Sequence, residues 1–128
     1  FENIIKPNLK KKVILIDRFK DSTIAYQHYG FKINKRIILE LNNFILGNLK
    51  PDFTFLHTVP LKNIKKNITG KKNKYDRFSK SFYKNVQLGF LKILKKNKNK
   101  LIIDSSKTKE YNAMIIKDKI KRILRIDE

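Results

Sequence analysis

The chain has 128 residues, enough for one domain with a buried core, and carries 31 basic against 11 acidic side chains for a net charge of +20. It contains no cysteine, which excludes disulfides, thiol nucleophiles and cysteine-ligated zinc and is typical of a reducing compartment. No apolar run approaches the roughly 18 residues that a membrane helix requires, and no signal peptide is visible. We therefore expect a soluble, cytoplasmic protein without a membrane partner.

The basic excess alone would suggest a nucleic-acid partner. Most of these residues are lysines scattered along every segment, however, and Ile and Asn are also abundant, as a bias in base composition would produce. A dedicated nucleic-acid binder more often gathers arginines and aromatics on one face. We expect no specific nucleic-acid partner. The two histidines, His28 and His57, are too far apart in sequence for a local metal motif.

Residues 1–12 precede a continuous apolar run at 13–17. This run predicts a strand that is buried on both faces of a parallel sheet. Asp17 ends this run and Arg18 follows at once. Ligands of such sheets lie beyond the carboxyl ends of the strands, so this charged pair is expected to face a crevice. The residues at 21–23, Asp-Ser-Thr, then supply N-cap chemistry for a short helix.

A second helical pattern begins at Asn34 and ends at Gly47. Its apolar positions share one face of a helix and are Ile37, Ile38, Leu41, Phe44 and Ile45. This stripe predicts core packing first. If it is wider than the sheet requires, it could also serve as a dimer contact.

The remaining elements are expected in chain order as a strand at 53–59, a short helix at 61–69, a basic loop at 70–77, a helix at 78–97, a strand at 101–104 and a helix at 109–125. Strands that alternate with helices predict the α/β class, as a three-layer α/β/α sandwich with a parallel sheet and right-handed crossovers. Three strands make a narrow sheet with uncovered edges. At least one further strand and helix are therefore expected to belong to the fold.

The residue types that phosphoryl transfer needs are present, namely arginine and lysine clamps and a carboxylate for magnesium. The P-loop pattern G-x-x-x-x-G-K-[ST] occurs nowhere in the sequence. Its Gly-Lys pair occurs once, at Gly70-Lys71, and the position five residues before that glycine is Lys65.

Five blocks of the sequence resemble bacterial thymidylate kinases in order and spacing. They are D-R-F-x-x-S-T-x-A-Y-Q at 17–27, K-P-D-F-T-F-L at 50–56, D-R-F at 76–78, V-x-x-G-F-L at 86–91 and I-I-D-S-S at 102–106. The resemblance covers essentially the whole chain. It implies a P-loop nucleoside-monophosphate-kinase-like fold that is incomplete at its N-terminus, with residues 1–128 as a single partial domain.

The same resemblance implies the reaction. A thymidylate kinase transfers the γ-phosphoryl group of ATP to dTMP to give dTDP for dTTP biosynthesis, with ATP as co-substrate and Mg²⁺ as cofactor. In that family the P-loop lies in an N-terminal third, so this sequence corresponds to the C-terminal two thirds. We expect the 128 residues alone to be inactive.

The resemblance also implies roles for individual residues. Arg18 matches the arginine that grips the phosphate of dTMP, and a guanidinium suits that oxygen geometry. Asp17 matches the acidic residue near the magnesium and the phosphates, where it would hold Mg²⁺ directly or through water. The positions that match the thymine and sugar subsites of dTMP are Ser22, Thr23, Tyr26 and Gln27.

The basic loop at 65–77 matches the lid that closes over ATP, and the turn from Asp104 matches the adenine side. The implied ATP-facing residues are Lys65, Lys66, Lys71, Lys72, Arg77, Asp104, Ser105 and Ser106. Lys66 and Arg77 join Asp17 and Arg18 as expected catalytic residues. The sequence departs from the family here, because the lid usually carries arginines and lysine lacks the guanidinium fork.

Each of these residues could instead have a purely structural role. Tyr26 could be a core aromatic, Ser22 only a helix cap and Asp104 only the end of a strand, while the lid lysines could be a solvated run. For the whole chain, the alternatives are a non-enzymatic basic module that binds nucleic acid, or a degenerate kinase-like scaffold. The family is typically homodimeric, and the helix at 34–47 is the expected contact.

Overall fold

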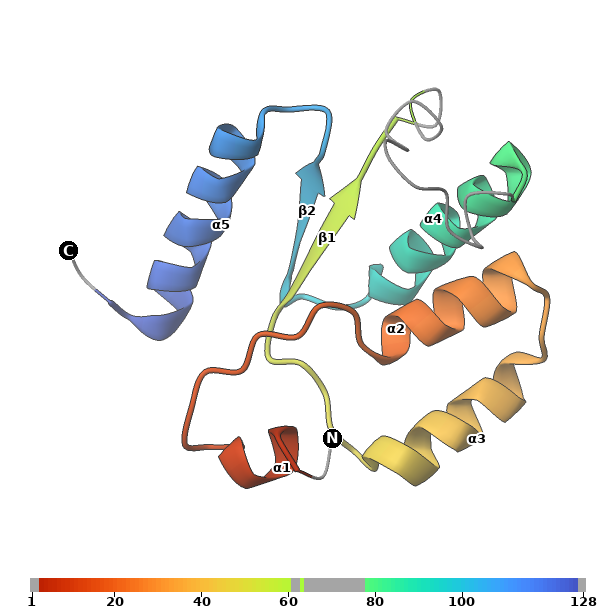
Figure 1. Ribbon diagram of the computed structural model, residues 1–128, viewed down its shortest axis with the longest axis horizontal. Helices are drawn as coiled ribbons and strands as arrows, with labels where there is room; N and C mark the ends of the chain where they lie inside the picture. Colours follow the sequence, from red (N-terminus) through yellow and green to blue (C-terminus); the bar gives the residue numbers. More distant parts are fainter. Residues whose placement is uncertain (1–2, 61–62, 64–77, 127–128) are drawn as a thin grey trace.

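The computed structural model describes residues 3–60, 63 and 78–126. Its elements are α1 (Ile5–Asn8), α2 (Lys20–Thr23), the π-helix η1 (Ile24–Gly30), α3 (Lys35–Leu46), β1 (Thr54–Thr58), α4 (Lys80–Leu94), β2 (Lys100–Asp104) and α5 (Lys109–Leu124) (Figure 1). None of the described helices has the length and apolar character needed to cross a lipid bilayer.

The two strands form a parallel pair in which Phe55 faces Leu101 and His57 faces Ile103. Figure 1 shows α5 on one side of these strands and α4, η1 and α3 on the other. Leu56 and Ile103 are the buried apolar residues of the strands. The α/β class and the parallel sheet between helices are confirmed. The strands expected at 53–59 and 101–104 are confirmed to within one residue of their ends.

The strand predicted at 13–17 is wrong as secondary structure. Val13–Ile16 form no backbone hydrogen bond with any described residue, and the sheet has two strands within the described part of the chain. The physical reason is that apolar bulk favours a strand only when a neighbouring backbone is there to pair with it. Without that neighbour, the side chains of Val13 and Leu15 remain 62% and 80% exposed.

The predicted N-cap at 21–23 is also wrong. The helix begins earlier, at Lys20, and the residue before it, Phe19, makes no side-chain cap. The backbone N–H of Ser22 donates to the carbonyl oxygen of Phe19 at 2.9 Å. The helix then continues as η1 as far as Gly30, three residues beyond the expected motif.

The longer helices begin and end close to the predicted residues because their caps are local. The side-chain oxygen of Asn34 accepts from the N–H of Arg36 and begins α3, and Gly47 ends it with a φ of +55°. Ser79 caps α4 and Thr108 caps α5 in the same way. The short helix expected at 61–69 and the loop at 70–77 lie outside the described residues, apart from Asn63.

The core lies where η1 crosses α4 and is built from Ala25, Phe82 and Val86. Two glycines let these helices approach closely. A Cβ atom on Gly30 would lie 2.7 Å from the ring of Phe82, and one on Gly89 would lie 2.6 Å from the side chain of Tyr29. The close approach fixes η1, and with it the side chains at the start of α2.

Candidate functional site

Arg18 occupies the turn between Val13–Ile16 and α2. Its backbone φ of +66° lies in the left-handed region, which a non-glycine residue adopts only where the surrounding structure holds it. Its guanidinium lies over the ring of Tyr26, 5.4 Å from the ring centre, at cation–π distance. No carboxylate of the described residues lies within ion-pair distance of it. The turn therefore presents an oriented guanidinium that has no anionic partner.

The ring beneath Arg18 is itself held in place. Tyr26 meets Phe82 and Phe90 edge to face, with ring centres 6.2 and 6.4 Å apart. Tyr26 thus packs against the core at the same time as it supports Arg18. Tyr26 is therefore part of the packing around the core, and its role beside the sugar of dTMP stays a prediction.

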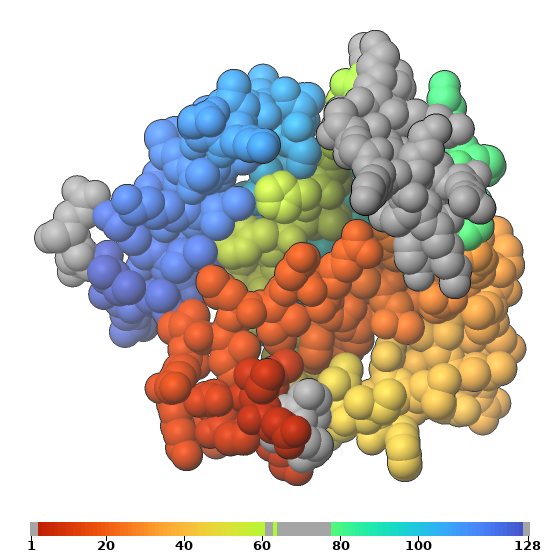
Figure 2. All heavy atoms as spheres, viewed as in Figure 1, coloured from red at the N-terminus to blue at the C-terminus, as the bar shows by residue number. Residues whose placement is uncertain are grey.

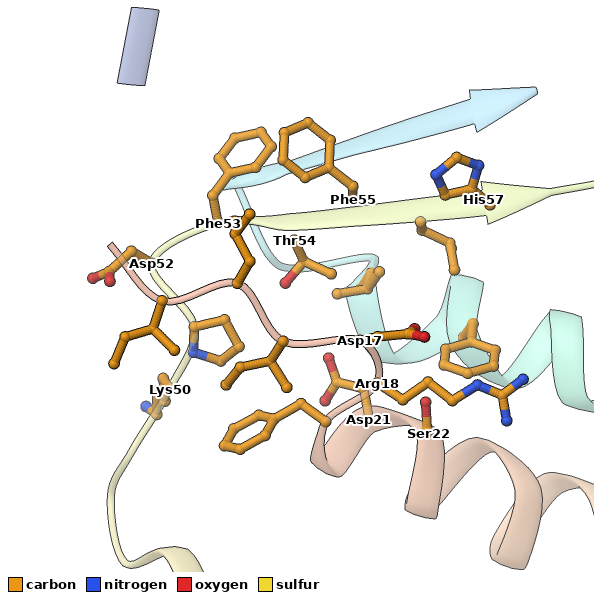
Figure 3. Close-up of a pocket in the computed structure, with 18 of the residues that line it drawn as sticks. Asp17, Arg18, Asp21, Ser22, Lys50, Asp52, Phe53, Thr54, Phe55 and His57 are labelled. Carbon is orange, nitrogen blue, oxygen red and sulfur yellow. The ribbon is translucent and has the colours of Figure 1, made fainter. Parts of the chain in front are cut away.

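A cavity of about 790 Å³ opens beside this turn, within the range of small-molecule sites. Its walls come from Val13–Ile16, the start of α2, β1 with the loop that leads into it, and the inner faces of α4 and α5. Figure 3 shows Asp17, Arg18, Asp21 and Ser22 together at one end of this cavity, across from β1. An arginine, two carboxylates and a hydroxyl therefore line one space.

Some of the expected dTMP-binding residues line the cavity and others do not. Arg18, Ser22 and Tyr26 line the cavity. Thr23 is exposed and Gln27 is half-buried, and neither is among the lining residues. The roles of all of them stay predictions.

Asp21 is a cavity residue that sequence reasoning treated only as a cap. Partial burial raises the pKa of its carboxyl group, and the positive charge of Lys20 partly opposes this. The ammonium group of Lys20 donates to the carbonyl oxygen of Leu49 at 2.7 Å, which ties the start of α2 to the loop before β1. The burial of Asp21 is a property of the packed structure, so no local pattern could reveal it.

Replacing Asp21 by asparagine will raise the free energy of unfolding at neutral pH. A carboxyl group whose pKa is raised on folding contributes stability below its ordinary value near 3.8 and loses it as the pH rises through the raised pKa. The ionised carboxylate is therefore unfavourable at neutral pH, and the amide removes that penalty. Urea titrations across the acid range will show the gain vanish below that value. Asp52→Asn, at an exposed position, controls for the loss of one negative charge; an equal gain in both variants would contradict the prediction.

The carboxyl ends of the two strands carry a second polar group. Hydrogen bonds from Ser106, first from its side chain and then from its backbone N–H at 2.9 Å, lower the pKa of the Asp104 carboxyl group. The N–H of Ser105 donates to the carbonyl oxygen of Thr58, and the Ser105 hydroxyl lies 3.2 Å from Nδ1 of His57. Asp104 and Ser105 thus close the turn after β2. The predicted adenine-side role of Asp104, Ser105 and Ser106 remains a prediction, and His57, which also lines the cavity, was not predicted as a site residue.

The predicted lid lies outside the residues that the structure describes. Lys65, Lys66, Lys71, Lys72 and Arg77 all lie outside the described residues, and their catalytic and ATP-binding roles remain predictions.

The site's carboxylates fit one mode of magnesium binding. No group of three or more histidine, aspartate or glutamate side chains gathers as a metal cage in the described ranges. Mg²⁺ at phosphate-transfer sites is held by one or two carboxylates together with substrate phosphates and waters. Asp17 and Asp21 line the cavity beside Arg18, so the donor set fits that mode.

Comparisons with known proteins point to one family. The sequence model described as thymidylate kinase matches residues 1–115. The chain is 39% identical over 114 residues to a thymidylate kinase of Ehrlichia chaffeensis, a match that covers 88% of this chain and 54% of that protein. It is 35% identical over 131 residues to a thymidylate kinase of Aster yellows witches'-broom phytoplasma, covering 97% and 63% respectively.

A solved structure agrees with these relatives. The crystal structure of thymidylate kinase from Ehrlichia chaffeensis matches the fold with a TM-score of 0.64 at 30% identity, over 98% of this chain and 57% of that one. The chain therefore spans between half and two thirds of the length of the relatives it matches.

Proposed function

This chain belongs to the thymidylate kinase family, and on that premise we propose that it supplies the monophosphate site of an enzyme that phosphorylates dTMP with ATP. The products are dTDP, for dTTP synthesis, and ADP. The main support for the proposal is the guanidinium of Arg18, which lines the cavity, lies over Tyr26 and has no anionic partner among the described residues. The enzyme acts in the cytoplasm and needs no nucleic acid or membrane.

Phosphoryl transfer depends on placing two polyanions in line and neutralising the charge on the transferring oxygens. The forked N–H groups of Arg18 bind the phosphate of dTMP, and Tyr26 holds the guanidinium in place and borders the sugar. The Ser22 hydroxyl lines the same cavity and serves the polar edge of the base. Asp17, with the phosphates, would hold Mg²⁺, which supplies positive charge at the transferring oxygens.

The P-loop pattern that binds the phosphates of ATP occurs nowhere in these 128 residues. In this proposal, polypeptide outside this sequence binds those phosphates. A chimera tests it: the chain is fused to the part of the Ehrlichia chaffeensis enzyme that lies outside their match. With dTMP and Mg-ATP, chromatography will show dTDP from the chimera and none from the chain alone. A folded chimera that leaves dTMP untouched overturns the proposal, and if it phosphorylates dCMP or dGMP instead, the substrate assignment is wrong.

We propose further that the enzyme is a homodimer that pairs through α3. The exposed side of this helix carries Ile37, Leu41, Phe44 and Ile45, each more than half exposed, and Phe44 is 89% exposed. An apolar stripe of this kind on a soluble protein marks a contact surface.

Phe44→Lys will convert the dimer of the chimera to monomer, raising its dissociation constant at least about tenfold because a central aromatic carries much of an interface's energy. Light scattering after size-exclusion chromatography measures the mass. Leu39→Lys, on the opposite side of the same helix, is the matched control and should remain dimeric. A monomeric parent, or a dimer that Phe44→Lys leaves intact, would refute the assignment of α3.

A further inference from the structure

Within the described part of the chain, no strand pairs with the side of β2 that faces away from β1. The N–H of Ser105, just after β2, donates to the carbonyl oxygen of Thr58 in β1. Every second residue of a parallel strand bonds the same neighbour, so Leu101 and Ile103 also direct their backbone groups to β1, and Ile102 directs its own outward. No described residue hydrogen-bonds the N–H or the carbonyl oxygen of Ile102, which is 46% exposed. This edge therefore offers a donor and an acceptor to an incoming strand.

Apolar side chains lie on both faces of this edge. On one face a hollow of about 250 Å³ lies between β2 and α5, and its lining residues are Leu101, Ile115, Asp118, Lys119 and Arg122. On the other face lies the side chain of Ile102, because successive residues of a strand point to opposite faces. Figure 2 shows the light-blue residues that follow β2 and the blue residues of α5 together on one flank of the molecule. A strand added here would contact an apolar side chain on each of its faces.

The surroundings of the edge are strongly basic. Residues 95–122, which run from the end of α4 through β2 into α5, carry ten basic and three acidic side chains. Exposed lysines lie shortly before and after the strand, at Lys98 and Lys107. Lysines at a sheet edge discourage pairing with another basic strand, and a second copy of this chain would also bring a charge of +20. The same charges attract an acidic strand and select it over other partners.

We propose that the free edge of β2 binds an extended, acidic segment of another protein by strand addition. The backbone groups of Ile102 hold the segment, and its side chains contact Leu101 on one face and Ile102 on the other. Its carboxylates face Lys119 and Arg122 at the hollow. The hollow shares no lining residue with the cavity beside Arg18, so this surface is independent of the proposed phosphorylation of dTMP.

A short peptide of alternating glutamate and valine, as long as β2, is the probe, and one of alternating lysine and valine is its control. Fluorescence anisotropy should show saturable binding of the acidic peptide, at least about tenfold tighter than that of the basic one. Amide exchange measured by NMR should slow at Ile102 and stay unchanged at Leu101 and Ile103, which already bond β1. No binding, or equal binding of both peptides, overturns the proposal. So does slowed exchange at Phe55 and His57 with none at Ile102, because the peptide would then pair with β1.

A pair of substitutions at one position isolates the backbone. Ile102→Pro removes the outward N–H and no bond of the β1–β2 ladder, whereas Ile102→Ala shortens the side chain and keeps that N–H. The proline variant should bind the acidic peptide at least about tenfold more weakly than the alanine variant. Exchange at Leu101 and Ile103 in the free variants verifies that the strands stay paired. Equal affinities of the two variants would exclude strand addition.

A second pair isolates the charge and leaves the backbone of the sheet untouched. Arg122→Glu reverses an exposed cation at the hollow, and Lys84→Glu makes the same change in net charge at an exposed position on α4. The first should weaken binding of the acidic peptide at least about tenfold, and the second should leave it near that of the parent chain. Equal weakening by both variants would mean that net charge alone attracts the peptide, and the assignment to this edge would be wrong.

Discussion

Arg18→Ala in the chimera will lower kcat/KM for dTMP by at least about 100-fold, because the proposed charged, forked hydrogen-bond pair to the phosphate is lost. The guanidinium of Arg18 lies over the ring of Tyr26, and both residues line the cavity together with Ser22. Steady-state kinetics with saturating Mg-ATP measures the effect. The free energy of unfolding should change little, since the side chain is exposed.

Two companion variants separate charge, geometry and backbone strain. Arg18→Lys keeps the charge without the planar fork and should retain an intermediate activity. Arg18→Gly removes the guanidinium and also relieves the left-handed φ of +66°, which strains alanine. If glycine and alanine lose activity equally, the guanidinium is responsible. If the glycine variant retains the parent's kcat/KM, the phosphate-binding role is excluded.

Phe82→Ala will lower the free energy of unfolding by about 3–5 kcal/mol, the usual loss for a buried aromatic. Phe82 is buried, stacks on Phe78 with ring centres 4.4 Å apart and meets Phe31 at 5.0 Å. Its ring also fills the space that Gly30 leaves, so truncation opens a cavity where η1 crosses α4. Urea denaturation measures the change.

The matched control is Phe44→Ala on α3, where an aromatic of the same size is almost fully exposed. Measured on the monomer, where the proposed α3 contact is absent, its loss should be within about 0.5 kcal/mol. Comparable losses for the two phenylalanines would show that the η1–α4 crossing is not the core. Because Phe82 also contacts Tyr26, its truncation should weaken dTMP binding as well, through the ring that supports Arg18.

The sequence predicted elements well where the determining chemistry is local. Asn34 and Gly47 cap α3 through bonds to residues within a turn of themselves, so the helix could be placed almost to the residue. The segment at 13–17 failed for the opposite reason. Its composition favours a strand, but pairing needs a distant backbone, and no described residue supplies one.

In the candidate site, too, the residues determined by local sequence were predicted and those determined by distant contacts were not. Asp17, Arg18, Ser22 and Tyr26 were predicted from one sequence block and line one cavity, because α2 and η1 keep them close. The burial of Asp21 and the presence of His57 at the same cavity depend on how distant segments pack. The start of α2 at Lys20 was missed because a tertiary hydrogen bond to Leu49 forms there, where sequence reasoning looked for a side-chain cap.

The most direct test of this account is a crystal structure of the chimera with bound dTMP. The account predicts the nucleotide's phosphate on the guanidinium of Arg18, with the sugar beside Tyr26. Phosphate density elsewhere in the protein, with Arg18 still over Tyr26 and making no contact with the nucleotide, would contradict it.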